Sequence, residues 1–177
     1  MSRNKQTLIL ILDTGALLAK YYRLVPNYVA EIYTSAMNVG EVLDLENKQA
    51  LEEAIALNLV KVVEPEKQYI EKAVHLARGF GYLHKLSTAD VNLIALALQL
   101  SEKKSGNIIV ITDDYDIQNL LYLLGIPFKP LRTSGIKKPT IYKAWCPTCG
   151  YVPRNPGEDT CPLCNSKIVR KQANIPS

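Results

Sequence analysis

Short apolar runs alternate with amphipathic stretches over the first 130 residues of the chain. The run from Thr7 to Leu12 is continuous, rich in β-branched residues and ends at Asp13, which is typical of a strand buried in a parallel sheet. Further strands share this apolar character and are expected over residues 31–34, 59–63 and 107–111 and just after residue 127. Helical spacing of apolar residues covers 39–44, 49–58, 66–78, 88–100 and 115–124. Strands separated by helices predict an α/β sandwich around a mainly parallel sheet.

The pattern changes after residue 130. Residues 131–142 are rich in Pro, Gly, Lys and Arg, which is the composition of a linker. Residues 143–177 contain every cysteine of the chain and are too few to hold themselves together by an apolar core alone. We therefore expect a main domain over residues 1–130, a basic linker over 131–142 and a small C-terminal domain over 143–177.

The cysteines have the spacing C-x2-C-x11-C-x2-C, with Cys146, Cys149, Cys161 and Cys164 in the four positions. Two such corners can direct four thiolates at one Zn²⁺ in a tetrahedron, as in a compact zinc ribbon. Four thiolates leave no open position for a substrate, so we expect this zinc to be structural. The alternative interpretation is a redox pair or a disulfide.

Charge is divided unevenly along the chain, although the net charge is only +4. Residues 1–127 carry 12 Lys and Arg against 15 Asp and Glu, whereas residues 128–177 carry nine against two. An acidic body with a basic, metal-stapled tail predicts that the tail binds a polyanion. The alternative is that these basic residues only solubilise a linker.

The basic side chains of the small C-terminal domain are candidates for salt-dependent, mainly sequence-independent contacts with phosphates. They are Lys143, Arg154, Lys167, Arg170 and Lys171. Trp145 or Tyr151 is available to stack on a base, and the alternative is that these two rings form the domain's own core.

The N-terminal residues 1–6 precede a short apolar run that Asp13 interrupts, which fits neither a signal peptide nor a membrane span. No cysteine lies outside the metal-binding pattern. We therefore expect a cytoplasmic protein without a membrane partner, because the cytoplasm keeps thiols reduced.

Five acidic side chains are expected near one edge of the sheet. Asp13 follows the first strand, and Asp113 and Asp114 follow the strand over residues 107–111. Asp90 lies in the first turn of a helix, and Glu41 comes after the second strand. The carboxyl ends of parallel strands face one crevice, where crowded carboxylates repel one another unless they bind divalent cations. We expect Mg²⁺ or Mn²⁺ there, which would polarise a phosphodiester and generate a hydroxide nucleophile.

Each carboxylate also has a structural interpretation. Asp90 stands at the third position of its helix, as in a variant of the capping box, and Asp113 or Asp114 could cap the helix that follows. Glu41 could lie on a solvated helix face. The catalytic interpretation gains weight from Asp13, because a carboxylate at the end of a buried strand is costly without a partner.

These motifs together resemble those of PIN-domain nucleases. The matching stretches are Leu10–Thr14, Ala36–Glu41, Leu86–Asp90 with Leu93–Ala97, and Thr112–Asp114. More narrowly, Thr112–Asn119 followed by a four-cysteine ribbon resembles the Nob-type endonucleases of small-subunit ribosome maturation. The chain departs from the pattern at Ala36, where a hydroxyl residue is common, and at Tyr82, where an Asp is expected.

The resemblance implies a PIN-like α/β/α sandwich with a C-terminal zinc ribbon, and a metal-dependent endoribonuclease. The implied substrate is precursor small-subunit rRNA, cut at its mature 3′ end to leave a 3′-hydroxyl. The implied partners are the immature small ribosomal subunit and an RNA-binding assembly factor. The implied ligands of the catalytic metal are Asp13, Glu41, Asp90 and either Asp113 or Asp114, with spacing from Thr112 favouring Asp114.

Two other functions compete with this one. A toxin-like PIN ribonuclease would cut tRNA or mRNA, but such toxins usually lack a ribbon. A non-catalytic assembly factor would use the ribbon to bind rRNA or protein, and its carboxylates would be dispensable.

Overall fold

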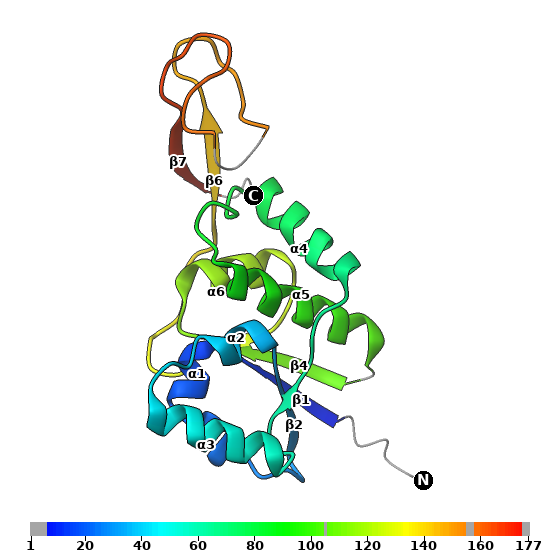
Figure 1. Ribbon diagram of the computed structural model, residues 1–177. Coiled ribbons are helices and arrows are strands. Elements are labelled where there is room, and N and C mark those ends of the chain that lie inside the picture. The colour runs from blue at the N-terminus through cyan, green and yellow to red at the C-terminus, as the bar shows by residue number, and fades with distance from the viewer. Residues whose placement is uncertain (1–6, 105, 155–157, 175–177) are drawn as a thin grey trace, which may run out of the picture.

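The computed structural model describes residues 7–104, 106–154 and 158–174 (Figure 1). Its larger part is a five-stranded sheet with helices on both faces, and its smaller part is a two-stranded ribbon. Residues 1–6, on which the expectation about a signal peptide rests in part, lie outside the described ranges. No helix in those ranges is long and apolar enough to cross a membrane.

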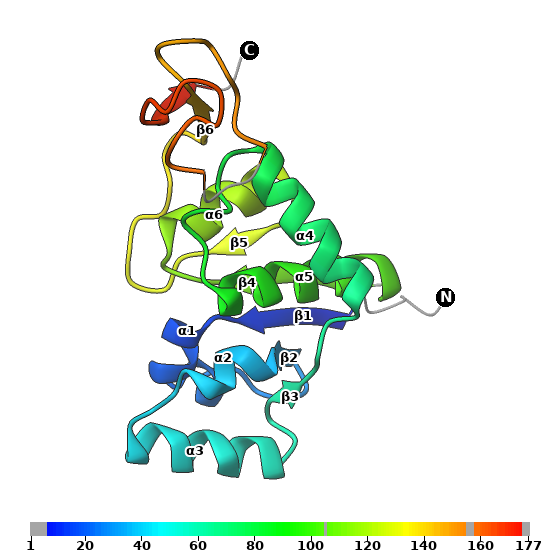
Figure 2. The same cartoon turned by 45° about the horizontal axis from the view of Figure 1, so that its top comes forward.

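The sheet has the strand order β3-β2-β1-β4-β5, and every pairing in it is parallel (Figure 2). The strands are β1 (Thr7–Leu12), β2 (Ala30–Thr34), β3 (Lys61–Val62), β4 (Gly106–Ile111) and β5 (Phe128–Lys129). The central pair, β1 and β4, runs from Thr7 opposite Gly106 to Leu12 opposite Ile111. Strands covered on both faces are apolar throughout, which explains the continuous runs in the sequence. The expected α/β class with a mainly parallel sheet is confirmed.

The sheet separates two cores, each of which lies between one face of the sheet and the helices that cover it. These helices are α1 (Thr14–Leu18), the 3₁₀ turn η1 (Tyr21–Arg23), α2 (Ala36–Gly40), α3 (Leu45–Ala56), α4 (Lys67–Gly79), α5 (Thr88–Lys103) and α6 (Tyr115–Leu123). On one face, α4, α5 and α6 pack against side chains such as Ile9 and Val110. On the other face, α1, η1 and α3 pack against Leu10 and Leu12. Figure 1 shows α4 and α3 on opposite sides of the strands.

Helix boundaries before residue 60 differ from the sequence prediction. The expected helix over 39–44 is wrong, because α2 begins after Ser35, whose hydroxyl accepts a hydrogen bond from the Asn38 amide at 3.2 Å. Asp44 lies outside α2 and caps α3 instead, accepting from the Asn47 amide at 2.9 Å. The segments α1 and η1 were not predicted, since helices of five and three residues are too short for periodicity to reveal.

The ribbon consists of β6 (Thr140–Trp145) and β7 (Val169–Asn174), which pair antiparallel with Trp145 opposite Val169. β6 begins at Thr140 and therefore includes the last three residues of the expected linker. The preceding segment is tied to the body through α6. The Gln118 side chain donates to the Thr112 carbonyl and accepts from the Ile136 amide, both at 2.9 Å. The Asn119 side-chain oxygen Oδ1 accepts from the Thr140 amide at 3.0 Å.

The ribbon also docks directly on the loop that follows α4. The Tyr142 amide donates to the Phe80 carbonyl at 3.0 Å, and the Tyr82 hydroxyl donates to the Thr140 carbonyl at 2.8 Å. The rings of Tyr82 and Tyr142 meet edge to face at 5.2 Å between centroids. The position where the family resemblance led us to expect an Asp therefore holds a buried ring that fixes the ribbon.

Candidate active site and metal centre

Asp13 lies at the carboxyl end of the central strand β1. Its amide donates to the Ile111 carbonyl of β4 at 3.1 Å, which continues the sheet by one residue. One carboxylate oxygen accepts from the Thr14 amide at 2.6 Å and the other from the Thr112 hydroxyl at 2.8 Å. Burial raises the Asp13 pKa to about 6, against the lowering effect of these bonds, and the charges of Asp90 and Asp114 raise it further.

Glu41 is placed beside Asp13 through Thr14. The Thr14 hydroxyl donates to Glu41 Oε2 at 2.6 Å and accepts from the Asn38 side-chain amide at 3.1 Å. Asn38 is fully buried, so this donor occupies a fixed place. Glu41 Oε1 and the rest of its exposed side chain face solvent, and no bond to Oε1 occurs within the described residues.

Asp90 belongs to a complete capping box at the start of α5. Its carboxylate accepts from the Ser87 amide at 2.7 Å, and its own amide donates to the Ser87 hydroxyl at 3.1 Å. Burial raises the Asp90 pKa against the lowering effect of the bonds to Ser87, and the charges of Asp114 and Glu41 add to the rise. The structural interpretation of Asp90 is therefore correct, and the same side chain also faces the other carboxylates.

Asp113 and Asp114 have different surroundings. Asp114 caps α6 through one oxygen, which accepts from the Asp116 and Ile117 amides at 2.7 and 3.0 Å. Its other oxygen makes no hydrogen bond within the described chain, and its charge raises the pKa of both Asp13 and Asp90. Asp114 thus belongs to the acidic cluster.

Asp113 faces the segment that leads to the ribbon. Its carboxylate accepts from the amides of Leu131, Arg132 and Thr133 at 2.8 to 3.1 Å, and the Arg132 side chain lies 3.3 Å away. Burial raises the Asp113 pKa, but these backbone donors outweigh it and lower the pKa to about 2. Asp113 is therefore occupied as an anchor for residues 131–133.

We define the acidic cluster as Asp13, Glu41, Asp90 and Asp114. None of its members forms a salt bridge with any residue in the described ranges. Their oxygens also lie too far apart to form a compact ligand group like that of the cysteines. The cluster is therefore a partly desolvated concentration of negative charge, with free oxygens suited to a hard divalent cation.

The supporting roles of Thr14, Asn38 and Thr112 were not predicted, although all three residues lie in the stretches that match the family. Each holds a carboxylate or its immediate neighbour by a side-chain hydrogen bond. The available signal was position, because each polar residue lies within one turn of a strand's carboxyl end. Ser35 supplies a hydroxyl one position before Ala36 and caps α2.

The four cysteines form a compact group at the far end of the ribbon. Their sulfurs all lie within 4.8 Å of one another, and three of the separations are 3.4, 3.5 and 3.6 Å. These values exceed the roughly 2.05 Å of a disulfide and approach the roughly 3.8 Å edge of a tetrahedral zinc–thiolate site. Gly150 and Asn165 follow the two Cys-x-x-Cys turns with φ of 74° and 57°, so both turns have the same left-handed end. The donor set fits Zn²⁺.

The basic candidates lie on the surface of the ribbon. Lys143, Arg154, Lys167 and Lys171 are exposed, whereas Arg170 is half-buried and donates to Asp159 at 2.6 Å and to the Glu158 carbonyl at 2.7 Å. Tyr151 packs on the small core of Cys146, Cys161 and Ile168. Trp145 lies outside that core, so the structure separates the two rings that the sequence left equivalent.

A parallel α/β sheet with an acidic cluster at its carboxyl edge defines a class of metal-dependent nucleases. Residues 10–100 match the family model described as the PIN domain of ribonuclease. The chain is 34% identical over 163 residues to endoribonuclease Nob1 of Methanothermobacter thermautotrophicus, covering 92% of each protein. It is also 34% identical to ribonuclease VapC3 of Aeropyrum pernix, over 71% of this chain and 88% of the relative.

The match to Nob1 covers 163 residues and therefore reaches into the ribbon, whereas the match to VapC3 covers 126 residues. A further relative is the 20S-pre-rRNA D-site endonuclease NOB1 of Saccharomyces cerevisiae, 31% identical over 53% of this chain and 20% of that protein. The chain therefore belongs to the PIN-domain ribonucleases and, within them, to the family of the endoribonuclease Nob1.

Proposed function

We propose that this endoribonuclease cleaves precursor small-subunit rRNA at the mature 3′ end on the immature ribosomal subunit. The observation that carries the catalytic part is the acidic cluster, in which the half-buried Asp13 faces Asp90 and Asp114 without a basic partner in the described chain. The yeast relative is a 20S-pre-rRNA endonuclease, and this similarity supports the choice of substrate.

Asp13, Asp90 and Asp114, with Glu41 beside them, are the proposed ligands of Mg²⁺ or Mn²⁺. Such an ion, when bound, lowers the pKa of a water molecule and offsets the charge of the phosphodiester. Thr112 and Thr14 orient Asp13, the Ser87 turn orients Asp90, and the first turn of α6 orients Asp114. We favour Asp114 over Asp113, because Asp113 is saturated by the amides of residues 131–133.

The ribbon is the proposed RNA-holding part, with a structural Zn²⁺ on its four cysteines. Its exposed lysines and Arg154 would contact phosphates without reading sequence. We keep the division into residues 1–130, 131–142 and 143–177 as a proposal, with the middle segment anchored rather than free. Four thiolates on one ion also favour the reducing cytoplasm as the place of action.

The test is cleavage of a short RNA that spans the 3′ junction of small-subunit rRNA. The purified protein with Mn²⁺ should give one main cut with a 3′-hydroxyl, lost when Mn²⁺ is omitted and in Asp13→Asn. Glu71→Gln, which removes an exposed carboxylate on α4, is the matched control and should cleave normally. Unchanged cleavage in Asp13→Asn would overturn the assignment.

The two alternative functions can be tested with RNA substrates and variants of the same kind. The similarity to VapC3 favours a toxin-like activity, in which tRNA or mRNA would be cut in preference to the junction RNA and expression would arrest growth. A non-catalytic assembly factor would keep its function in Asp90→Ala and lose it in Cys146→Ser.

A further inference from the structure

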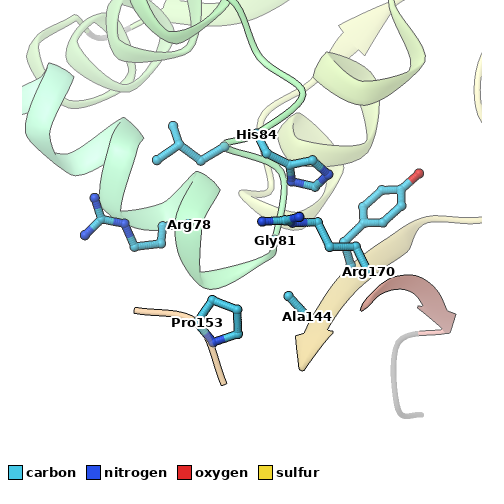
Figure 3. A pocket seen from close by; sticks show the side chains of 8 residues that line it. Arg78, Gly81, His84, Ala144, Pro153 and Arg170 are labelled. Carbon is cyan, nitrogen blue, oxygen red and sulfur yellow. The ribbon is translucent and has the colours of Figure 1, made fainter. Parts of the chain in front are cut away.

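A groove separates the C-terminal end of α4 from the ribbon. Arg78 and the loop 79–84 form its body side, and Tyr142–Trp145 with Val152–Pro153 form its ribbon side. The larger of its two adjoining cavities has a volume of about 450 Å³, which is within the range of small-molecule sites. Figure 3 shows His84 from the body close to Arg170 from the ribbon, while Arg78 lies on the other side of Gly81 with its guanidinium directed outward, away from both. We call it the junction groove.

The lining of the junction groove is basic and aromatic. Arg78, Lys143 and Arg170 line it, and no Asp or Glu of the described chain does. Arg78 is exposed and makes no salt bridge within the described residues, whereas Arg170 is held by the acidic loop at Glu158 and Asp159. A guanidinium beside an open cavity is suited to a phosphate.

Trp145 gives the groove an apolar wall. It is half-buried on the ribbon side and remains outside the core under the cysteines. An aromatic face next to cationic side chains is the arrangement that binds single-stranded nucleic acid, because any base can stack on the ring while its phosphate meets the cation. An acidic peptide would use the cations alone and leave the ring without a partner.

The junction groove is also connected to the acidic cluster by the chain itself. His84 lies on the groove, and Asp90 lies in the cluster six residues later. Their Cα atoms are therefore at most about 22 Å apart. The intervening loop is fixed at Lys85, which pairs with Asp116 at 3.0 Å and lies over the Tyr142 ring at 4.4 Å.

We propose that the junction groove binds one nucleotide of the single-stranded RNA that leads to the acidic cluster, with Arg78 on its phosphate and Trp145 on its base. The proposal rests on the proposed function, since it takes RNA as the substrate. It assigns an RNA contact to α4, outside the ribbon, and makes substrate binding depend on the docked position of the ribbon.

Trp145 is the only tryptophan of the 177 residues, so its fluorescence reports on the junction groove directly. The experiment titrates oligouridylate, which has no secondary structure, into zinc-loaded Asp13→Asn protein without added Mn²⁺ or Mg²⁺. Saturable quenching of Trp145 is expected. In the Asp13→Asn background, the second substitution Arg78→Gln should weaken oligouridylate binding about tenfold. It should also make the plot of log binding constant against log salt concentration less steep by about 0.7.

The matched control is Lys67→Gln, which removes one positive charge from the opposite end of α4, about 17 Å away along the helix. It should bind oligouridylate as the parent does, and the melting temperatures of both variants show whether they fold. Trp145→Ala, followed with labelled oligouridylate, should also weaken binding about tenfold or more.

The proposal is overturned if oligouridylate binds without changing Trp145 fluorescence, or if Arg78→Gln and Lys67→Gln bind equally well. It is also overturned if polyglutamate quenches Trp145 at the same concentration, because the groove would then respond to charge alone. Cleavage of the junction RNA is measured separately, with wild-type Asp13, and tests the proposed function. Quenching without cleavage would refute that function, whereas cleavage without quenching would refute the groove.

Discussion

At Asp13, two neutral hydrogen-bond donors hold a half-buried carboxylate that no cation of the described chain accompanies. Its pKa near 6 means that the folded state binds a proton more tightly than the unfolded chain, whose value is near 3.8. Stability therefore falls as the pH rises from about 4 to about 6, and stays reduced above that window. The ionised Asp13 is destabilising by itself, and the proposed divalent cation would offset this cost.

Asp13→Asn is expected to raise the free energy of unfolding at pH 7 to 8, with no added divalent cation, by on the order of 2 kcal/mol. The reason is that the variant avoids ionising a half-buried carboxyl group. Denaturant unfolding at several pH values measures the effect, and the difference from wild type should vanish below about pH 4. A variant that is less stable than wild type at pH 8 would contradict this account of Asp13.

The residue scale is also where the sequence is least decisive. Asp113 and Asp114 are adjacent and both follow β4, so the spacing from Thr112 favours Asp114 but does not exclude Asp113. Only the fold shows that one carboxylate turns to the amides of residues 131–133 while the other caps α6 and faces Asp13. The supporting hydrogen bonds of Asn38 and Thr112 cannot be predicted from the sequence either, because their partners lie 24 and 99 residues away.

At the element scale, the strands and long helices follow from the sequence. The core strands β1 and β4 and the buried helix α5 were predicted because their apolar patterns are long and their ends are marked by Asp, Ser or Gly. The short α1 and α2 depend on local caps and on tertiary hydrogen bonds, and periodicity cannot reveal elements of five residues.

The capping box of α5 joins stability to function in one element. Ser87→Ala should lower the free energy of unfolding by about 1 kcal/mol, because the Asp90 amide loses its acceptor. It should also slow cleavage of the junction RNA, since Asp90 loses the neighbour that fixes its turn. Thermal melts and single-turnover cleavage measure the two effects.

The control for this prediction is Thr88→Ala at the next position, which is exposed and makes no side-chain hydrogen bond within the described chain. Thr88→Ala should change neither the free energy of unfolding nor the rate of cleavage by much. Loss of stability without any loss of cleavage in Ser87→Ala would show that the cap does not position Asp90.

At the scale of the whole molecule, the ribbon is held against the body by contacts that could not be predicted from the sequence. Tyr82 and Gly81 meet Thr140 and Tyr142 across about 60 residues of chain. The Gln118–Asn119 pair, whose presence made the family resemblance more specific, anchors residues 136 and 140. The expected linker is therefore a fixed bridge, and its composition alone could not show this.

Gly81 is the residue on which this docking depends most. Its φ is 78°, and a Cβ there would collide with the Tyr142 carbonyl. Gly81→Ala should lower the free energy of unfolding by about 2 kcal/mol or more and release the ribbon, seen as faster proteolysis within residues 131–142. The zinc content should be unchanged, since the cysteines lie elsewhere.

Gly79→Ala provides the matched control two residues earlier, where an added Cβ would meet nothing within 4 Å and φ is not positive. It should be neutral or slightly stabilising, because alanine favours the helix. Equal behaviour of the two variants would refute the idea that Gly81 is needed for close approach.

The central claim is that Asp13, Asp90 and Asp114 hold a divalent cation, and Mn²⁺ titration of the zinc-loaded protein tests it most directly. Calorimetry or electron paramagnetic resonance should detect binding by wild-type protein and a loss of at least tenfold in affinity for Asp13→Asn and Asp114→Asn. Asp113→Asn should bind Mn²⁺ nearly as wild type does, although its loop is less stable. Equal binding by all four proteins, or loss only in Asp113→Asn, would contradict the account.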